Sequence, residues 1–167
     1  MKIISLLKIA INLALAFLII SGALLLKSCT NKNSLQIEDL KCEYKTNPLG
    51  IDNLSPRFSW KIIDQNQTRG QKQTAYQILL SSSLKNLEAN LADVWDSGKI
   101  ESNQSVNVKY GGSDLASAQQ YFWKVKTWDK NAKVSNWSEA AHFSMGLLDK
   151  KDWKGEWIYK KDQNKKD

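Results

Sequence analysis

The chain has 167 residues, of which 42% are hydrophobic and only two are cysteine. This composition allows one ordinary globular domain with additional end segments and excludes a small disulfide-built scaffold. The formal net charge is +7, but the excess lies at the two ends, and residues 30–149 hold 14 basic against 13 acidic side chains. Because that central part has no basic stripe interleaved with aromatic residues, we expect no nucleic-acid partner.

Residues 1–28 have the pattern of an export signal. Two lysines begin the segment, and an apolar run then extends from residue 9 to residue 26. A basic start followed by an apolar stretch is typical of a signal peptide. The run is also long enough to span a membrane as an uncleaved helix, which is the alternative interpretation.

The sequence "LLKSC" at 25–29 resembles a bacterial lipobox. The resemblance implies that Cys29 is the site of lipid attachment and the first residue of the mature protein. Lys27 departs from the small or apolar residue usual at that place. With either anchor, we expect an exported, membrane-anchored protein on the periplasmic or cell-surface side of a bacterial membrane.

The rest of the chain alternates between short apolar-polar segments and turns. A polar tether over residues 29–36 leads into segments of strand period, with one short helical turn predicted within 84–95. The strand-like segments include 35–44, 57–63, 74–83, 105–110, 121–129 and 139–146. About seven short strands with a turn every 8–12 residues are typical of a sandwich. We therefore predict an all-β immunoglobulin or fibronectin type III-like β-sandwich over residues 37–147.

The aromatic residues divide between the two faces of the predicted strands. In "YFWKVKTWD" (121–129), Tyr121 and Trp123 share the inner face, whereas Trp128 lies outward with two lysines. An outward ring can stack on a sugar or pack against another domain, and we favour the second role. The predicted structural core contains Trp60, Tyr76, Tyr121 and Trp123, and the candidate sugar or interdomain contacts are Trp128, Trp137 and Trp95.

Two further residues have predicted structural roles. The spacing from Leu115 to Tyr121 resembles the tyrosine corner of fibronectin type III domains, although the usual Pro and Thr between them are absent. Cys42 lies alone in an alternating apolar segment, so it is interpreted as a small core residue.

Four motifs occur in order along the chain: "NPLGIDNLSPRFSWKI" (47–62), "QTAYQILLSSS" (73–83), "VWDSGKIES" (94–102) and "YFWKVKTWDKNAKVSNWSEAAHFSMGLLDKKDWKGEWI" (121–158). Together they resemble the N-terminal region of bacterial α-L-rhamnosidases. In that family a fibronectin type III-like sandwich precedes an (α/α)6 barrel whose two carboxylates hydrolyse terminal rhamnose with inversion. The resemblance implies that residues 148–167 are the truncated start of a following domain, which we expect to be disordered. It also implies that the partner is the missing C-terminal catalytic part of the same polypeptide.

The residues themselves also argue against catalysis by this chain. Inverting hydrolysis needs two carboxyl groups about 6.5–9.5 Å apart in a cleft, and the candidate acids (Asp93, Asp96, Asp114 and Asp129) are all in or beside turns. His142 is the single histidine and has no metal-ligand spacing. Ser97 and Ser138 lack a base to activate them. We therefore expect no catalytic residue, no metal and no cofactor.

The leading hypothesis is a non-catalytic accessory domain of a membrane-anchored α-L-rhamnosidase, inactive when alone. The alternative is a free-standing surface module for carbohydrate binding or adhesion. Hydrolysis of a glycoside by this chain itself is the least favoured of the three.

Overall fold

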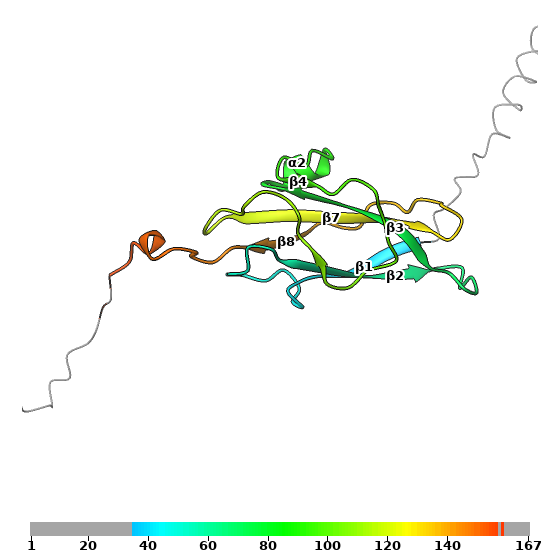
Figure 1. Ribbon diagram of the computed structural model, residues 1–167, viewed down its shortest axis with the longest axis horizontal. Helices are drawn as coiled ribbons and strands as arrows, with labels where there is room; N and C mark the ends of the chain where they lie inside the picture. The colour runs from blue at the N-terminus through cyan, green and yellow to red at the C-terminus, as the bar shows by residue number, and fades with distance from the viewer. Residues whose placement is uncertain (1–34, 157, 159–167) are drawn as a thin grey trace, which may run out of the picture. The chain divides into compact units, whose positions relative to one another are not determined.

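The computed structural model describes residues 35–156 and 158, so the predicted signal segment and Cys29 lie outside the described residues. The described chain is almost entirely β-structure (Figure 1). Its elements in chain order are β1 (Leu35–Cys42), β2 (Arg57–Asp64), β3 (Gln73–Ser81), α2 (Leu84–Glu88), β4 (Trp95–Asp96), β5 (Ile100–Glu101), β6 (Val108–Lys109), β7 (Gln120–Asp129), β8 (Ala141–Ser144) and the 3₁₀ turn η1 (Lys150–Asp152). In this part of the chain no helix is both long and apolar enough to cross a membrane.

The strands form two antiparallel sheets, as an immunoglobulin-like sandwich requires. One sheet has the order β1-β2-β6, and the other has the order β4-β3-β7-β8 with β5 also paired to β3. The long strands agree with the predicted segments, and β1 begins at Leu35, inside the range predicted as tether. The region around "WDSG" contains two short strands outside the predicted strand-like segments, because β4 and β5 flank its turn and both pair with β3.

The core lies between the sheets and is built from large aromatic residues. Phe58 of β2 and Trp123 of β7 are completely buried, with ring centroids 4.6 Å apart. Trp60 packs edge-on against Tyr76 at 5.3 Å, and its indole N–H donates to Gln73 Oε1 over 3.0 Å. That hydrogen bond satisfies a donor that would otherwise be costly to bury. Strict alternation along β2 and β7 therefore places these rings in the interlayer space.

Tyr121 is buried at the start of β7, and its hydroxyl oxygen accepts a hydrogen bond of 2.8 Å from the backbone N–H of Ala116. This is the contact expected of a tyrosine corner, formed here without the usual Pro and Thr. Cys42 is 1% exposed at the end of β1, and burial raises the pKa of its thiol to about 12. The thiol is consequently a packed core group with almost no reactive thiolate near neutral pH.

Candidate functional site

The three tryptophans predicted to face outward do not lie together. Trp95 packs inward, with its ring centroid 5.1 Å from that of Tyr110 and 6.4 Å from that of Phe58. Trp128 and Trp137 are both half-buried on the outer side of β7. The candidate aromatic surface therefore consists of Trp128 and Trp137 alone.

Lysine ammonium groups cover both of these rings. Lys126 Nζ lies 4.5 Å from the ring centroid of Trp137 and 5.4 Å from that of Trp128. Lys124 Nζ approaches Trp137 at 5.3 Å, and Lys99 Nζ approaches Trp128 at 5.1 Å. We call this alternating series of Lys124, Trp137, Lys126, Trp128 and Lys99 the lysine–tryptophan ladder. Each contact lies within the range in which a cation is attracted to an aromatic face.

Two serines hold the segment that carries Trp137 against β7. Ser135 Oγ accepts from the N–H of Thr127 at 3.0 Å, and Ser138 Oγ accepts from the N–H of Val125 at 3.1 Å. The same hydroxyls donate to the carbonyl oxygens of Asn136 and Glu139. Both side chains therefore bind backbone groups of β7 and its flanking segment. The hydroxyl of Ser138 has this structural role and needs no role as a nucleophile to explain its position.

The ladder leaves little aromatic surface for a ligand. A sugar that stacks on Trp128 or Trp137 has to displace a lysine that already contacts the ring. Lysine stems commonly cover apolar surface in this way while the ammonium remains hydrated. Lysine side chains of this chain therefore cover the rings of both Trp128 and Trp137.

Lys124 is the residue of this face whose burial the sequence pattern did not predict. The alternation places it outward, yet it is buried, because α2 lies over this part of β7. Its Nζ donates to the carbonyl oxygen of Leu87 at 2.5 Å and to Asn90 Oδ1 at 2.7 Å. Burial lowers the pKa of Lys124. The ammonium therefore ties the end of α2 to the sheet through the carbonyl oxygen of Leu87, which also accepts from the N–H of Asn90, and through the Asn90 side chain.

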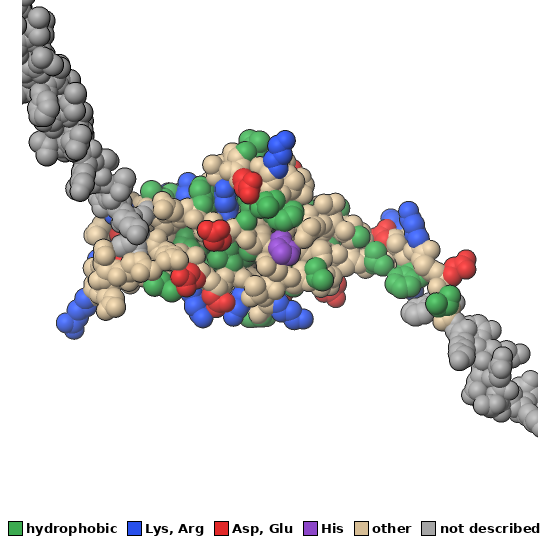
Figure 2. All heavy atoms as spheres, turned by 180° about the vertical axis from the view of Figure 1, so that it is seen from behind, with side chains coloured by type: hydrophobic (Ala, Val, Ile, Leu, Met, Phe, Trp, Pro, Cys, Tyr) green, Lys and Arg blue, Asp and Glu red, His purple; other side chains and the backbone are tan. Residues whose placement is uncertain are grey.

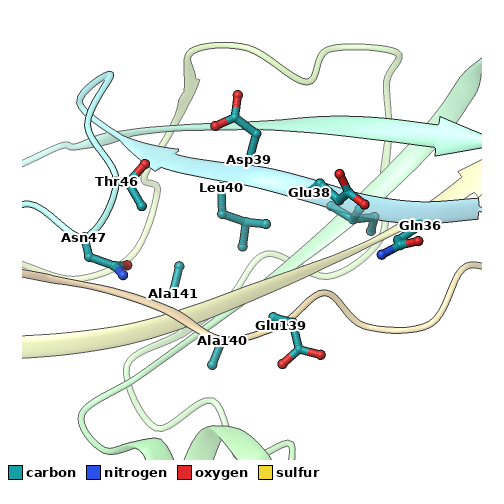
Figure 3. Close-up of a pocket in the computed structure, with 10 residues that line it drawn as sticks. Gln36, Glu38, Asp39, Leu40, Thr46, Asn47, Glu139, Ala140 and Ala141 are labelled. Carbon is teal, nitrogen blue, oxygen red and sulfur yellow. The ribbon is translucent and has the colours of Figure 1, made fainter.

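A shallow hollow of about 350 Å³ lies between the edges of β1 and β8 (Figure 3). Its floor is apolar, formed by Leu40, Ala140 and Ala141, and three carboxylates line its rim. In Figure 3 the carboxylates of Asp39 and Glu139 point away from each other on opposite sides of the hollow. Asp39 and Glu139 are therefore not the two facing acids that glycoside hydrolysis needs.

The electrostatics of the hollow also oppose acid catalysis. Asp39 accepts from Lys61 at 2.7 Å and lies 3.3 Å from Lys41. The hydrogen bond from Lys61 is the main cause that lowers the pKa of Asp39. A general acid in a glycosidase needs a raised carboxyl pKa, so Asp39 is poorly suited to that role.

The acids singled out from the sequence bind local backbone and side-chain donors. Asp96 Oδ1 accepts from the N–H of Gly98 at 2.8 Å, and Asp129 Oδ1 accepts from two backbone N–H groups of its own turn. Asp93 accepts from the N–H and hydroxyl of Ser82, and these hydrogen bonds lower its pKa against the opposing effect of burial. Asp114 lies in the loop between β6 and β7. The structure brings none of these acids into the hollow between β1 and β8.

The remaining candidate groups also have structural surroundings. Ser97 Oγ accepts from the N–H of Ile78 and donates to the carbonyl oxygen of Gly98. His142 lies beside Phe122, with ring centroids 6.0 Å apart, on a face where positive and negative side chains are mixed (Figure 2). Within residues 35–156 and 158, no three His, Cys, Asp or Glu side chains gather as metal ligands.

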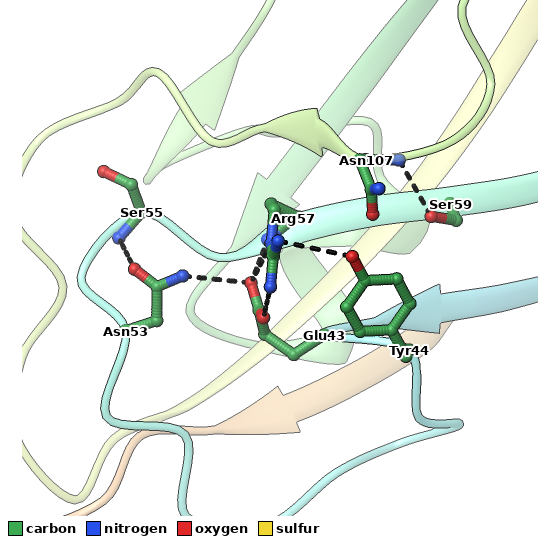
Figure 4. A network of polar contacts seen from close by, with 7 residues as sticks. All are labelled: Glu43, Tyr44, Asn53, Ser55, Arg57, Ser59 and Asn107. Atoms are coloured by element: carbon green, nitrogen blue, oxygen red, sulfur yellow. Dashed lines mark hydrogen bonds and ion pairs between the residues drawn. The ribbon is translucent and has the colours of Figure 1, made fainter.

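The loop between β1 and β2 is fixed by a polar network that sequence reasoning did not anticipate (Figure 4). Arg57 binds Glu43 through Nη2 at 2.6 Å and through Nε at 3.1 Å, and Asn53 Nδ2 donates to the same carboxylate at 3.0 Å. The guanidinium carbon also lies 5.0 Å from the ring centroid of Tyr44. The hydrogen bond from Arg57 is the leading cause that lowers the pKa of Glu43.

Comparison with known proteins finds similar domains within larger enzymes. Residues 37–149 match the family model described as "Rha78A-like, N-terminal immunoglobulin domain". An α-L-rhamnosidase of Formosa agariphila is 46% identical over 128 residues, which cover 76% of this chain and 13% of that protein. One of Alteromonas sp. is 47% identical over 116 residues, covering 70% and 12%.

Solved structures give the same correspondence. The α-L-rhamnosidase of Dictyoglumus thermophilum has a TM-score of 0.70 at 45% identity and covers 75% of this chain and 14% of that one. The Streptomyces avermitilis enzyme complexed with L-rhamnose has a TM-score of 0.69 at 38% identity, covering 75% and 12%. The chain thus spans only 12–14% of the length of these relatives.

Proposed function

The chain belongs to the family of Rha78A-like N-terminal immunoglobulin domains, and from that membership we propose that it serves as a non-catalytic accessory domain of an α-L-rhamnosidase. The supporting observation is the extent of the match. Similarity to the rhamnosidases covers about three quarters of this chain but no more than 14% of the compared enzymes. In this proposal, the other domains of such an enzyme hydrolyse the terminal rhamnose.

The chemistry of the sandwich supports this division of labour. Burial or a neighbouring like charge raises the pKa of a catalytic acid, whereas hydrogen bonds lower the pKa of the described carboxyl groups Asp39, Glu43 and Asp93. The space between the sheets is filled by aromatic and aliphatic side chains. The physical role left to the domain is to present a rigid surface to its neighbours in the polypeptide.

A domain exchange tests the proposal. Residues 35–149 replace the corresponding domain of the Dictyoglumus thermophilum enzyme, which is 45% identical to this chain and has a solved structure. The native enzyme and a version lacking the domain are the controls. We expect the exchanged enzyme to hydrolyse a chromogenic α-L-rhamnoside and to resist heat better than the deleted version. An exchanged enzyme no better than the deleted one would contradict the proposal.

We further propose that the domain is anchored to a membrane through a lipid on Cys29. The support comes from the sequence alone: an apolar run ends in the lipobox-like "LLKSC". Growth with a radiolabelled fatty acid should label the full chain, and Cys29→Ser should remove the label, with Cys42→Ser as the matched control. Equal labelling of the wild type and Cys29→Ser would refute lipid attachment.

A self-sufficient carbohydrate-binding module is the rival role. If the chain has this role, calorimetry should detect binding heat when the full chain is mixed with rhamnosides. The Trp128→Ala variant should lose that heat while it remains folded. Because lysines already occupy the ring faces of Trp128 and Trp137, we expect calorimetry to detect no heat with such glycans.

A further inference from the structure

Exposed leucines gather at the end of the sandwich where β8 terminates. Leu49 is 80% exposed and Leu54 is 51% exposed, both in the loop between β1 and β2, and Leu147 just beyond β8 is 47% exposed. We call these three residues the apolar end surface. Large apolar side chains this exposed are informative when several occur in one region.

Backbone pairing places the two segments side by side. Ile51 and Met145 form a parallel bridge, and the N–H of Gly146 donates to the carbonyl oxygen of Ile51 at 2.7 Å. The N–H of Ser144 donates to the carbonyl oxygen of Pro48 at 3.0 Å. Leu49 and Leu147 therefore lie on two neighbouring backbone segments. Figure 1 shows the loop between β1 and β2 at the same end of the sandwich as the end of β8.

The loop that displays Leu49 and Leu54 is held in an unusual conformation. Glu43, Tyr44, Asn47 and Gly50 all have positive φ values, between 47° and 69°. Non-glycine residues adopt such angles only where the surrounding structure enforces them, commonly at binding surfaces. The network of Glu43 with Arg57 and Asn53 provides that enforcement here. The leucines are thus presented by a pre-organised backbone, which reduces the entropy lost on docking.

The composition of the loop suits the buried centre of an interface. Between residues 46 and 56, Asp52 is the single charged residue. The lysine–tryptophan ladder, by contrast, is cationic. Charged residues are depleted at the centres of protein interfaces, so the apolar end surface is the better candidate for a stable contact.

We propose that the apolar end surface docks the domain that directly follows residue 149 in an α-L-rhamnosidase. This inference rests on the proposed function. If this sandwich is the N-terminal domain of such an enzyme, the polypeptide that follows it starts two residues after Leu147. Such a short connection gives the contact a high effective concentration. A partner with a complementary apolar patch then covers Leu49, Leu54 and Leu147 together.

Hydrogen exchange in the domain-exchanged enzyme tests this surface. We expect the amides of residues 49–55 to exchange about tenfold more slowly there than in the isolated full chain. The double variant Leu49→Ser/Leu54→Ser should lose that protection and lower the temperature at which the enzyme loses activity. The control Leu91→Ser/Val106→Ser replaces residues that are 59% and 56% exposed, and it should do neither. Both double variants should leave the melting temperature of the isolated chain unchanged.

Equal exchange in the enzyme and the isolated chain, or equal effects of the two double variants, overturns the docking surface while the proposed function stands. If the domain-exchanged enzyme without further substitutions is inactive, that result counts against the proposed function instead. In that case the full chain is mixed with the deleted Dictyoglumus enzyme, and sedimentation measures their association. Binding weakened by Leu49→Ser/Leu54→Ser but not by the control supports the surface, and no binding or equal binding by both variants rejects it.

Discussion

Lys126 Nζ lies 4.5 Å from the ring centroid of Trp137, a residue delivered by the separate segment that follows β7. The same ammonium lies 5.4 Å from the ring of Trp128 on its own strand. One cation therefore joins two aromatic side chains on the outer face of the sheet. This relationship makes the face a structural element that needs no ligand to cover its rings.

Lys126→Met should lower the free energy of unfolding by about 1 kcal/mol, because the change keeps an apolar stem but removes the cation from two rings. Denaturant titration of the full chain measures the change. Lys109→Met on β6, in the other sheet, is the matched control and should shift stability by less than about 0.5 kcal/mol. Equal effects of the two substitutions would show that the ladder adds nothing to stability.

Tyr121→Phe should cost about 1–2 kcal/mol, because the partly buried N–H of Ala116 then loses its acceptor. Tyr44→Phe removes a hydroxyl at an exposed position, where the hydrogen bond from Arg57 is 3.3 Å long, and should cost less than about 0.5 kcal/mol. Urea titrations of both variants compare the two hydroxyl groups. A Tyr121→Phe protein as stable as the wild type would mean that the tyrosine corner is dispensable.

The inner and outer faces of β7 differ in how far the sequence predicts them. Alternation places Tyr121 and Trp123 on the inner face, because the side-chain period of a strand is fixed by its backbone, and both side chains are buried. Alternation cannot tell what lies over the outer face. Lys124 is buried because α2 crosses above it, and Trp137 meets Lys126 because two serines hold its segment on β7. Both facts depend on tertiary contacts between segments that local patterns do not link.

The loop network was missed for a related reason. Glu43 and Arg57 are 14 residues apart, and each alone reads as an ordinary surface charge. The positive φ values of Glu43 and Tyr44 carry no sequence signal, since neither residue type favours that conformation. The sequence pattern predicts the fold class and the long strands. The conformation of the strained loop between β1 and β2 depends instead on tertiary contacts.

Glu43→Gln should remove part of the acid dependence of stability. The pKa of Glu43 is lowered from its ordinary value of 4.5, chiefly by the hydrogen bond from Arg57. The stabilisation from the ionised carboxylate is therefore complete above pH 4.5 and is lost as the pH falls through the lower folded-state pKa. Thermal melts between pH 7 and pH 3 should show a shallower decline for Glu43→Gln than for the wild type. Glu38→Gln on β1 is the control, and a decline identical in all three proteins would contradict this role.

The thiol of Cys42 should resist modification in the folded chain, because burial raises its pKa to about 12 and leaves it 1% exposed. In a Cys29→Ser background, a thiol-specific chromogenic reagent at pH 8 should react at least about a hundredfold faster after denaturant is added. Rapid reaction of the native protein would mean that the end of β1 opens readily.

The most direct test of the account is the hydrolysis of a chromogenic α-L-rhamnoside by the purified 167-residue chain alone. We predict a rate equal to that of the uncatalysed reaction, because the carboxylates of Asp39 and Glu139 point away from each other and hydrogen bonds lower the pKa of Asp39 and of Asp93. Turnover above that rate, abolished by a single substitution such as Asp93→Asn in a folded protein, would contradict a non-catalytic role.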